Sequence, residues 1–121
     1  MKVGENSGSF EDGQLSVDVF QTPEEIVIVA PVAGVNKNDL TVNITDEVLT
    51  IRGKRNFVFR VSGENYFTQE CFWGNFSRSI ILPESIDTSK VKATFSSGIL
   101  VIRIPKVEKI LYPKAPRQIN G

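Results

Sequence analysis

The sequence contains no histidine and a single cysteine, Cys71, in 121 residues. Without histidine, neither a Ser/His/Asp nor a Cys/His set of catalytic residues can be assembled, and a zinc site would lack most of its usual ligands. One cysteine also excludes a disulfide within the chain. We therefore predict no enzyme activity, no metal and no cofactor. We expect Cys71 to be a small buried or half-buried hydrophobe rather than a reactive thiol.

An excess of charge of one sign is also missing, because 14 Lys and Arg residues balance 14 Asp and Glu residues. Proteins that bind nucleic acid usually carry a basic stripe, so no nucleic-acid partner is predicted. A net charge near zero also removes one barrier to self-association, which favours an oligomer.

Long apolar runs are absent as well. The longest apolar stretch, residues 26–35, is too short for a membrane span, which needs roughly 20 residues. Residues 1–13 are rich in Gly, Ser, Glu and Asp and lack the apolar centre of a signal peptide. We expect a soluble cytoplasmic protein with no membrane span.

The sequence does have a period-two alternation of apolar and polar residues along most of its length, which is typical of half-buried strands. Residues 26–30 are apolar on both faces, so this strand is expected inside a sheet. No long segment carries a helical period. The predicted strands cover residues 15–20, 26–30, 40–44, 48–52, 66–73, 76–82, 91–95 and 99–104.

Turn residues separate these strands. The polar stretch 36–39 predicts a short turn, and Asp46-Glu47 predicts a tight hairpin. Ser96-Ser97-Gly98 suits a three-residue hairpin loop with glycine in the left-handed conformation. Several short strands with turn signals between them predict an all-β fold, a β-sandwich of one domain.

The most specific pattern is Ala-Thr-Phe-Ser-Ser-Gly-Ile-Leu-Val-Ile-Arg-Ile-Pro-Lys, residues 93–106. Its glycine makes a turn, and its alternating aliphatic residues fill a core before a proline ends the strand. This stretch closely resembles the signature hairpin of the α-crystallin domain, the domain of small heat-shock proteins. Three further pieces follow the order and spacing of that family: residues 15–22, 34–55 and 64–83.

The resemblance covers residues 14–107 and implies an immunoglobulin-like antiparallel β-sandwich over that range. A short disordered N-terminal segment (1–13) and a flexible C-terminal tail (108–121) are then expected. The loop length before Gly74 resembles the prokaryotic and plant branch, whose loop strand is exchanged with a partner subunit. The corresponding loop of relatives is mostly charged, whereas Phe57, Val58, Phe59 and Val61 make this one apolar.

By this resemblance we expect a homodimer in which residues 66–72 add to the edge strand 15–20 of the partner. Arg78 lies among aliphatic residues of a strand, where it either pairs with an acidic residue across the dimer or is an exposed arginine. The expected interface residues are Tyr66, Phe67, Thr68, Gln69, Glu70, Phe72, Ser16, Asp18, Phe20 and Arg78.

The resemblance also implies an apolar groove that binds a tail anchor or client segments. Alternation alone does not separate groove residues from core residues, so both alternatives stay open. Relatives carry an Ile-x-Ile/Val anchor in the tail, whereas this chain has only Ile119 before Asn120-Gly121, so we expect assembly beyond the dimer to be weak. The expected groove residues are Leu40, Val42, Ile44, Val91, Ala93 and Phe95.

Three classes of function are compatible with a sandwich of this size. The resemblance favours an ATP-independent holdase, which binds partly unfolded proteins and limits their aggregation. The alternative is a co-chaperone or adaptor domain that binds a specific protein without assembling. An enzyme is the third and least favoured class, because no set of catalytic residues and no phosphate-binding loop is present in the sequence.

Overall fold

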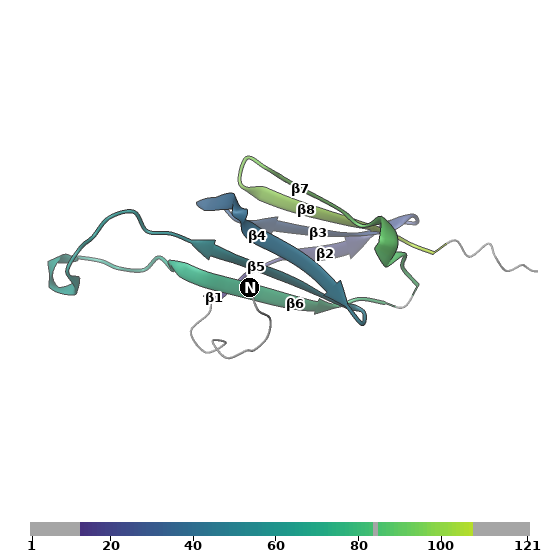
Figure 1. The fold of residues 1–121 in the computed structure, drawn as a ribbon, viewed down its shortest axis with the longest axis horizontal. Coiled ribbons are helices and arrows are strands. Elements are labelled where there is room, and N and C mark those ends of the chain that lie inside the picture. Colours follow the sequence, from purple (N-terminus) through teal and green to yellow (C-terminus); the bar gives the residue numbers. More distant parts are fainter. Residues whose placement is uncertain (1–12, 84, 108–121) are drawn as a thin grey trace, which may run out of the picture.

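Alternating apolar residues place one face of each strand in a common core, and the computed structural model describes the result for residues 13–83 and 85–107. Two four-stranded sheets lie face to face (Figure 1). All pairings are antiparallel except that of β1 with β6. The first sheet has the order β1 (Gly13–Gln14), β6 (Gly74–Ile81), β5 (Val48–Arg55), β4 (Val35–Thr45). The second sheet has the order β2 (Asp18–Gln21), β3 (Glu25–Pro31), β8 (Ile99–Pro105), β7 (Lys92–Ser96).

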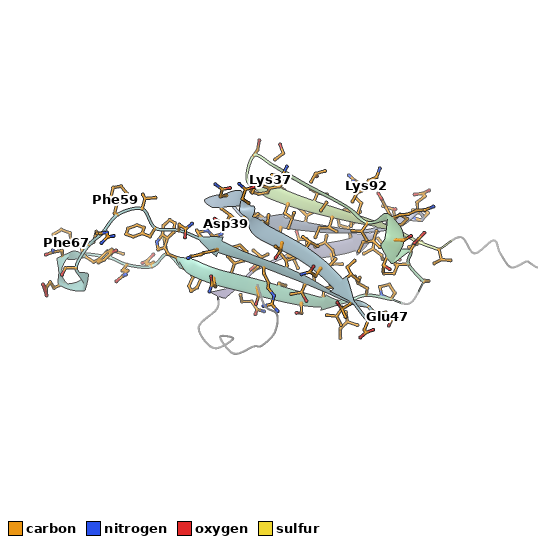
Figure 2. All side chains as sticks on the ribbon, in the orientation of Figure 1. Lys37, Asp39, Glu47, Phe59, Phe67 and Lys92 are labelled. Atoms are coloured by element: carbon orange, nitrogen blue, oxygen red, sulfur yellow. The ribbon has the colours of Figure 1, made fainter. Side chains whose placement is uncertain are left out.

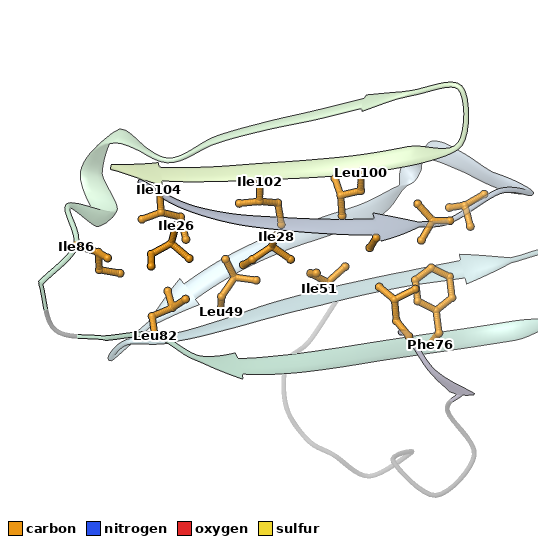
Figure 3. Packing of buried hydrophobic residues seen from close by; sticks show 14 residues of the cluster. Ile26, Ile28, Leu49, Ile51, Phe76, Leu82, Ile86, Leu100, Ile102 and Ile104 are labelled. Atoms are coloured by element: carbon orange, nitrogen blue, oxygen red, sulfur yellow. The ribbon is translucent and has the colours of Figure 1, made fainter. Parts of the chain in front are cut away.

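The predicted all-β sandwich is therefore confirmed, and its core lies between the two sheets (Figure 3). In the register of β3 and β8, Ile28 lies opposite Ile102, and both are fully buried. Leu49 and Ile51 of β5 face them from the first sheet. Removing one such side chain from water contributes about 1.5–3 kcal/mol to folding. The prediction that residues 26–30 form a strand inside a sheet is also correct.

Two hairpins have two-residue turns in which both central residues have a positive φ. These are Asp46 (51°) with Glu47 (67°), and Ser97 (52°) with Gly98 (78°). A positive φ at both positions matches the right-handed twist of the flanking strands. The first hairpin agrees with the prediction. The second corrects it, because Ser96 is the last residue of β7 and the loop has two residues instead of three.

The turn predicted over residues 36–39 is wrong, because these residues belong to β4. The strand is irregular here, with a shift of register between Val35 and Leu40. The Asn38 backbone N–H donates to Oδ1 of Asn36 at 2.9 Å. This local hydrogen bond resembles that of a turn. Polar residues that form such bonds are common in turns, which is why the sequence predicts a turn here.

The first predicted strand, residues 15–20, is divided between the two sheets. Residues 13–14 form β1 beside β6, and the chain then crosses to the second sheet, where β2 begins at Asp18. Leu15 lies buried at the crossing. The alternation of apolar residues identified the buried side chain, but it could not show that the chain changes sheets.

Residues 56–73, hereafter the excursion, leave the sandwich between β5 and β6 and project beyond one of its ends (Figure 1). They contain only η2 (Gly63–Asn65) and no strand, so the strand predicted over residues 66–73 is absent from the single chain. The other helical turn among the described residues is η3 (Thr88–Lys90), which lies between β6 and β7. No helix in residues 13–83 and 85–107 is long and apolar enough to cross a membrane.

Candidate binding surfaces

A groove opens where the edge strands of the two sheets, β4 and β7, lie at the same side of the sandwich. It has a volume of about 220 Å³. Its lining is Lys37, Leu40, Val42, Ala93, Thr94, Phe95 and Leu100. Because Leu40 and Val42 of β4 are only half-buried, the groove offers apolar surface that the core does not use.

Four of the six predicted groove residues line this groove: Leu40, Val42, Ala93 and Phe95. Ile44 and Val91 do not line it and pack as half-buried residues against the core. Lys37, Thr94 and Leu100 also line the groove, although the sequence does not predict them as groove residues. Lys37 lies in the stretch predicted as a turn, and only its position in β4 places it at the groove.

The predicted interface residues of the excursion lie apart from those of β2 in the single chain. Tyr66 is half-buried, whereas Phe67, Thr68, Gln69, Glu70 and Phe72 are exposed, and Phe67 points away from the sandwich (Figure 2). Asp18 and Phe20 are exposed on β2, which pairs only with β3. Within the described residues the outer backbone edge of β2 therefore carries no strand.

Phe72 and Ser16 both line a cavity of about 510 Å³ at the base of the excursion. A Cβ on Gly13 would lie 2.7 Å from the Phe72 ring, so glycine lets this ring rest on β1. The cavity is also lined by Leu15, Pro31, Arg55 and Phe76, together with Gly13 and Gln14.

Arg78 is half-buried, and its Nη1 donates to the backbone carbonyl of Leu15 at 2.9 Å. It thus holds the crossing segment against β6. The one ion pair among residues 13–83 and 85–107 joins Arg103 to Glu25 at 2.7 Å, so Arg78 has no acidic partner in this part of the chain.

Arg55 fixes the point where the excursion starts. Its Nε donates to the Ala33 carbonyl at 3.0 Å, and its guanidinium lies 5.3 Å from the centre of the Phe76 ring. Phe76 covers Gly53 so closely that a Cβ there would lie 2.3 Å from the ring. The match of these residues to the family pattern does not show that they pack together, and only the fold brings them into contact.

An aromatic cluster at the base of the excursion was also missed. The Phe57 ring centroid lies 5.0 Å from that of Trp73 and 5.7 Å from that of Phe59. Phe57 and Trp73 are 16 positions apart in the sequence and come from the two ends of the excursion. Only the folded chain brings the two ends together.

Titratable groups contribute little to these surfaces. The Ser89 hydroxyl and backbone N–H both donate to the Asp87 carboxylate and lower its pKa from the ordinary 3.8. No group of three or more metal-ligating side chains occurs among the described residues. Cys71 is exposed, which corrects the prediction of a buried or half-buried side chain, because the excursion has no core of its own.

The known proteins that this chain resembles all belong to one family. The model of the Hsp20/alpha crystallin family matches residues 18–120. Small heat shock protein C2 of Rickettsia felis is 35% identical over 92 residues, which are 76% of this chain and 60% of the relative. The 17.5 kDa class I heat shock protein of Glycine max is 37% identical over 93 residues, 76% of this chain and 61% of the relative. The chain thus spans about 60% of the length of these relatives.

Solved structures agree with this result. A small heat-shock protein from Xylella fastidiosa has a TM-score of 0.70 and 30% identity, covering 88% of this chain and 94% of that one. Heat shock protein 16.0 from Schizosaccharomyces pombe has a TM-score of 0.69 and 31% identity, covering 81% and 70%. Sequence, fold and neighbours together show that this chain belongs to the Hsp20/alpha crystallin family, that of the small heat-shock proteins.

Proposed function

We propose that the chain is an ATP-independent holdase, which binds apolar segments of partly unfolded proteins and limits their aggregation. The observation that carries the proposal is the open groove lined by Leu40, Val42, Ala93 and Phe95. Family membership supports it, since small heat-shock proteins are ATP-independent chaperones and not enzymes. The partners are then unfolding polypeptides in the cytoplasm, with no role for nucleic acid or a membrane.

The groove is suited to single apolar side chains. Transfer of one Leu- or Phe-sized side chain from water into it stabilises the complex by about 1.5–3 kcal/mol at most. The same apolar segments drive aggregation when a client unfolds, so occupying them slows aggregation without nucleotide. Lys37 and Thr94 at the groove keep part of its lining polar.

We also propose a homodimer in which residues 66–72 add as a strand to the outer edge of the partner's β2. Two observations support it: the excursion has no strand partner among the described residues, and β2 is paired on one side only. Addition of a strand satisfies the free N–H and C=O groups of an edge.

Larger assemblies are proposed to be weakly populated. The candidate anchor Ile119 lies outside the described residues. One isoleucine in a groove contributes about 1.5–3 kcal/mol before the cost of ordering the tail is subtracted. We therefore expect mainly dimers at micromolar concentration.

The holdase is tested with a heat-labile enzyme whose light scattering is followed with and without this protein. We expect lower scattering that ATP does not change, and a weaker effect from Val42→Ser, which makes the groove polar. Asn43→Ser is the matched control, because Asn43 is the exposed neighbour on the same strand. Unchanged scattering at an excess of the wild-type chain contradicts the holdase.

The dimer is tested by deleting residues 57–72 and closing the gap with a short Gly/Ser turn. We expect a folded monomer by sedimentation, since the deleted segment lies outside the sandwich. A variant that remains dimeric places the pairing on another edge. A wild-type chain that is a monomer and does not suppress scattering supports the adaptor instead.

A further inference from the structure

The first limb of the excursion, residues 57–61, presents apolar side chains. The strand addition proposed above involves residues 66–72 only and leaves these side chains without a partner surface. Phe57 and Phe59 lie on one side of it in ring contact, and Phe59 is 68% exposed. Val58 is 81% exposed and lies between them in the sequence. Because Phe57 also contacts Trp73, the rings of the limb are held in place by the base of the excursion.

The two outer faces of the sandwich differ in polarity. On the first sheet, Thr50 and Ser79 share a hydrogen bond of 3.3 Å across β5 and β6. On the second sheet, residues that are directly paired, and so point to the same side, form an apolar stripe. Val27 lies opposite Phe20, and Val29 lies opposite Val101.

This stripe is diagonal, because Val27 lies opposite Arg103 and Val29 lies opposite Asp18. It starts at Phe20 on β2, passes through Val27 and Val29 on β3, and continues to Val101 and Ile99 on β8. Phe20 is 50% exposed and Ile99, paired with Pro31, is 38% exposed. Val27 is only 3% exposed because its neighbours cover it, among them the ion-paired Arg103. The stripe therefore offers apolar surface next to the edge to which a partner strand would add.

The exposed apolar area of the excursion is divided between the strand segment and the limb. Phe67 and Phe72 of the strand segment together expose about 300 Å², taking roughly 200 Å² for a full phenylalanine. The limb and the neighbouring Trp73 expose about another 400 Å², through Phe57, Phe59, Val61 and Trp73. A stable interface buries about 800 Å² on each partner, polar side chains included. A dimer that left the limb uncovered would therefore leave more than half of this apolar area outside the interface.

We infer that the limb packs on the outer face of the second sheet of a second copy, over the stripe that starts at Phe20. The inference rests on the proposed dimer. When residues 66–72 add to the partner's β2, the rest of the excursion comes to lie beside that sheet, since β2 is its edge strand. The charges agree: the limb carries only Arg60, and the β2 end of the stripe carries Asp18.

The test compares Phe59→Ala with Val58→Ser as its control on the same limb. We measure the dimer dissociation constant by sedimentation over a dilution series. Trp73, the only tryptophan, serves as a second probe because its emission should shift to the blue when the limb is covered. We expect Phe59→Ala to weaken the dimer about tenfold or more, and Val58→Ser by less than about threefold.

A double-mutant cycle locates the contact. If Phe59 packs on the stripe, then Phe59→Ala and Val101→Thr together weaken the dimer clearly less than the product of their single effects. If the two substitutions weaken the dimer independently of each other, Phe59 does not pack on the stripe and the inference is overturned. Circular dichroism of each variant separates weaker pairing from unfolding.

Phe67→Ala separates this inference from the proposed dimer. If Phe67→Ala weakens the dimer and Phe59→Ala does not, the strand addition holds and the inference falls. If the Phe59→Ala variant dimerises normally but no longer suppresses aggregation, the limb binds clients instead of a second copy. That result also overturns the inference. If neither change weakens the dimer, the proposed dimer itself is wrong.

Discussion

The β3–β8 pair and the excursion are both rich in large apolar residues, yet the first is buried and the second is exposed. Ile28 and Ile102 face the opposite sheet and have no access to water, whereas Phe59 and Phe67 project beyond the end of the sandwich (Figure 2). Burial is therefore decided by whether a second surface stands opposite, and not by the apolar character of the segment. In the dimer proposed above, the excursion would supply one half of a core and a second copy of the chain the other half.

The largest expected effect is the difference in the free energy of unfolding between Ile102→Ala and Phe59→Ala. Ile102→Ala leaves a cavity between the sheets and should lower the free energy of unfolding by about 2–5 kcal/mol. Phe59→Ala removes an exposed side chain and should change the stability of the monomer by less than about 0.5 kcal/mol. Denaturant unfolding at a concentration where the chain is monomeric measures both. Similar losses in the two variants would mean that the excursion packs on its own sandwich.

A smaller effect is expected where the sandwich meets the excursion. Gly53→Ala would place a Cβ 2.3 Å from the Phe76 ring, which must then move. Overpacking of this kind costs about 1–3 kcal/mol. Gly63→Ala is the matched control within the excursion, since nothing lies within 4 Å of a Cβ there. Thermal unfolding should show a lower Tm for the first variant and an unchanged one for the second. Equal Tm values would contradict the packing of Phe76 on Gly53.

Arg78→Met tests which region this arginine serves. The Leu15 carbonyl loses its donor, and leaving such a group unpaired costs about 1–3 kcal/mol. We expect a loss at the low end of this range, because Arg78 is only half-buried and water can replace it. The dimer dissociation constant should not change. A weakened dimer with unaltered monomer stability would instead assign Arg78 to an ion pair with the partner.

The smallest effect concerns Asp87, whose backbone N–H donates to the Pro105 carbonyl at the end of β8. Its carboxylate accepts from Ser89 at the start of η3, and these hydrogen bonds lower its pKa below the ordinary 3.8. Because the pKa is lowered in the folded chain, the stabilisation is present above pH 3.8 and is lost as the pH falls through the folded value. Asp87→Asn should lower the Tm slightly at neutral pH. That difference should shrink towards zero in acid, as a pH series of melting curves would show. A difference that persists in acid would contradict this origin.

The sequence by itself determined the fold class and the family. Period-two alternation of aliphatic residues specifies strands with one buried face, and Gly98 followed by Ile99 to Pro105 specifies a hairpin that ends at a proline. These are local properties, since each strand carries its own pattern of burial. The same alternation put forward six groove candidates, and four of them line the cavity between β4 and β7.

Only the tertiary structure decided the contacts that link distant segments. Sequence patterns could not show that the chain changes sheets after Gln14, that Arg78 donates to Leu15, or that Phe57 meets Trp73. Nor could they show that Val27 and Val101 share an outer face with Phe20 while Ile28 faces the core. Alternation reports that one side of a strand is apolar. Which surface stands opposite that side depends on how the sheets and their edges come together in space.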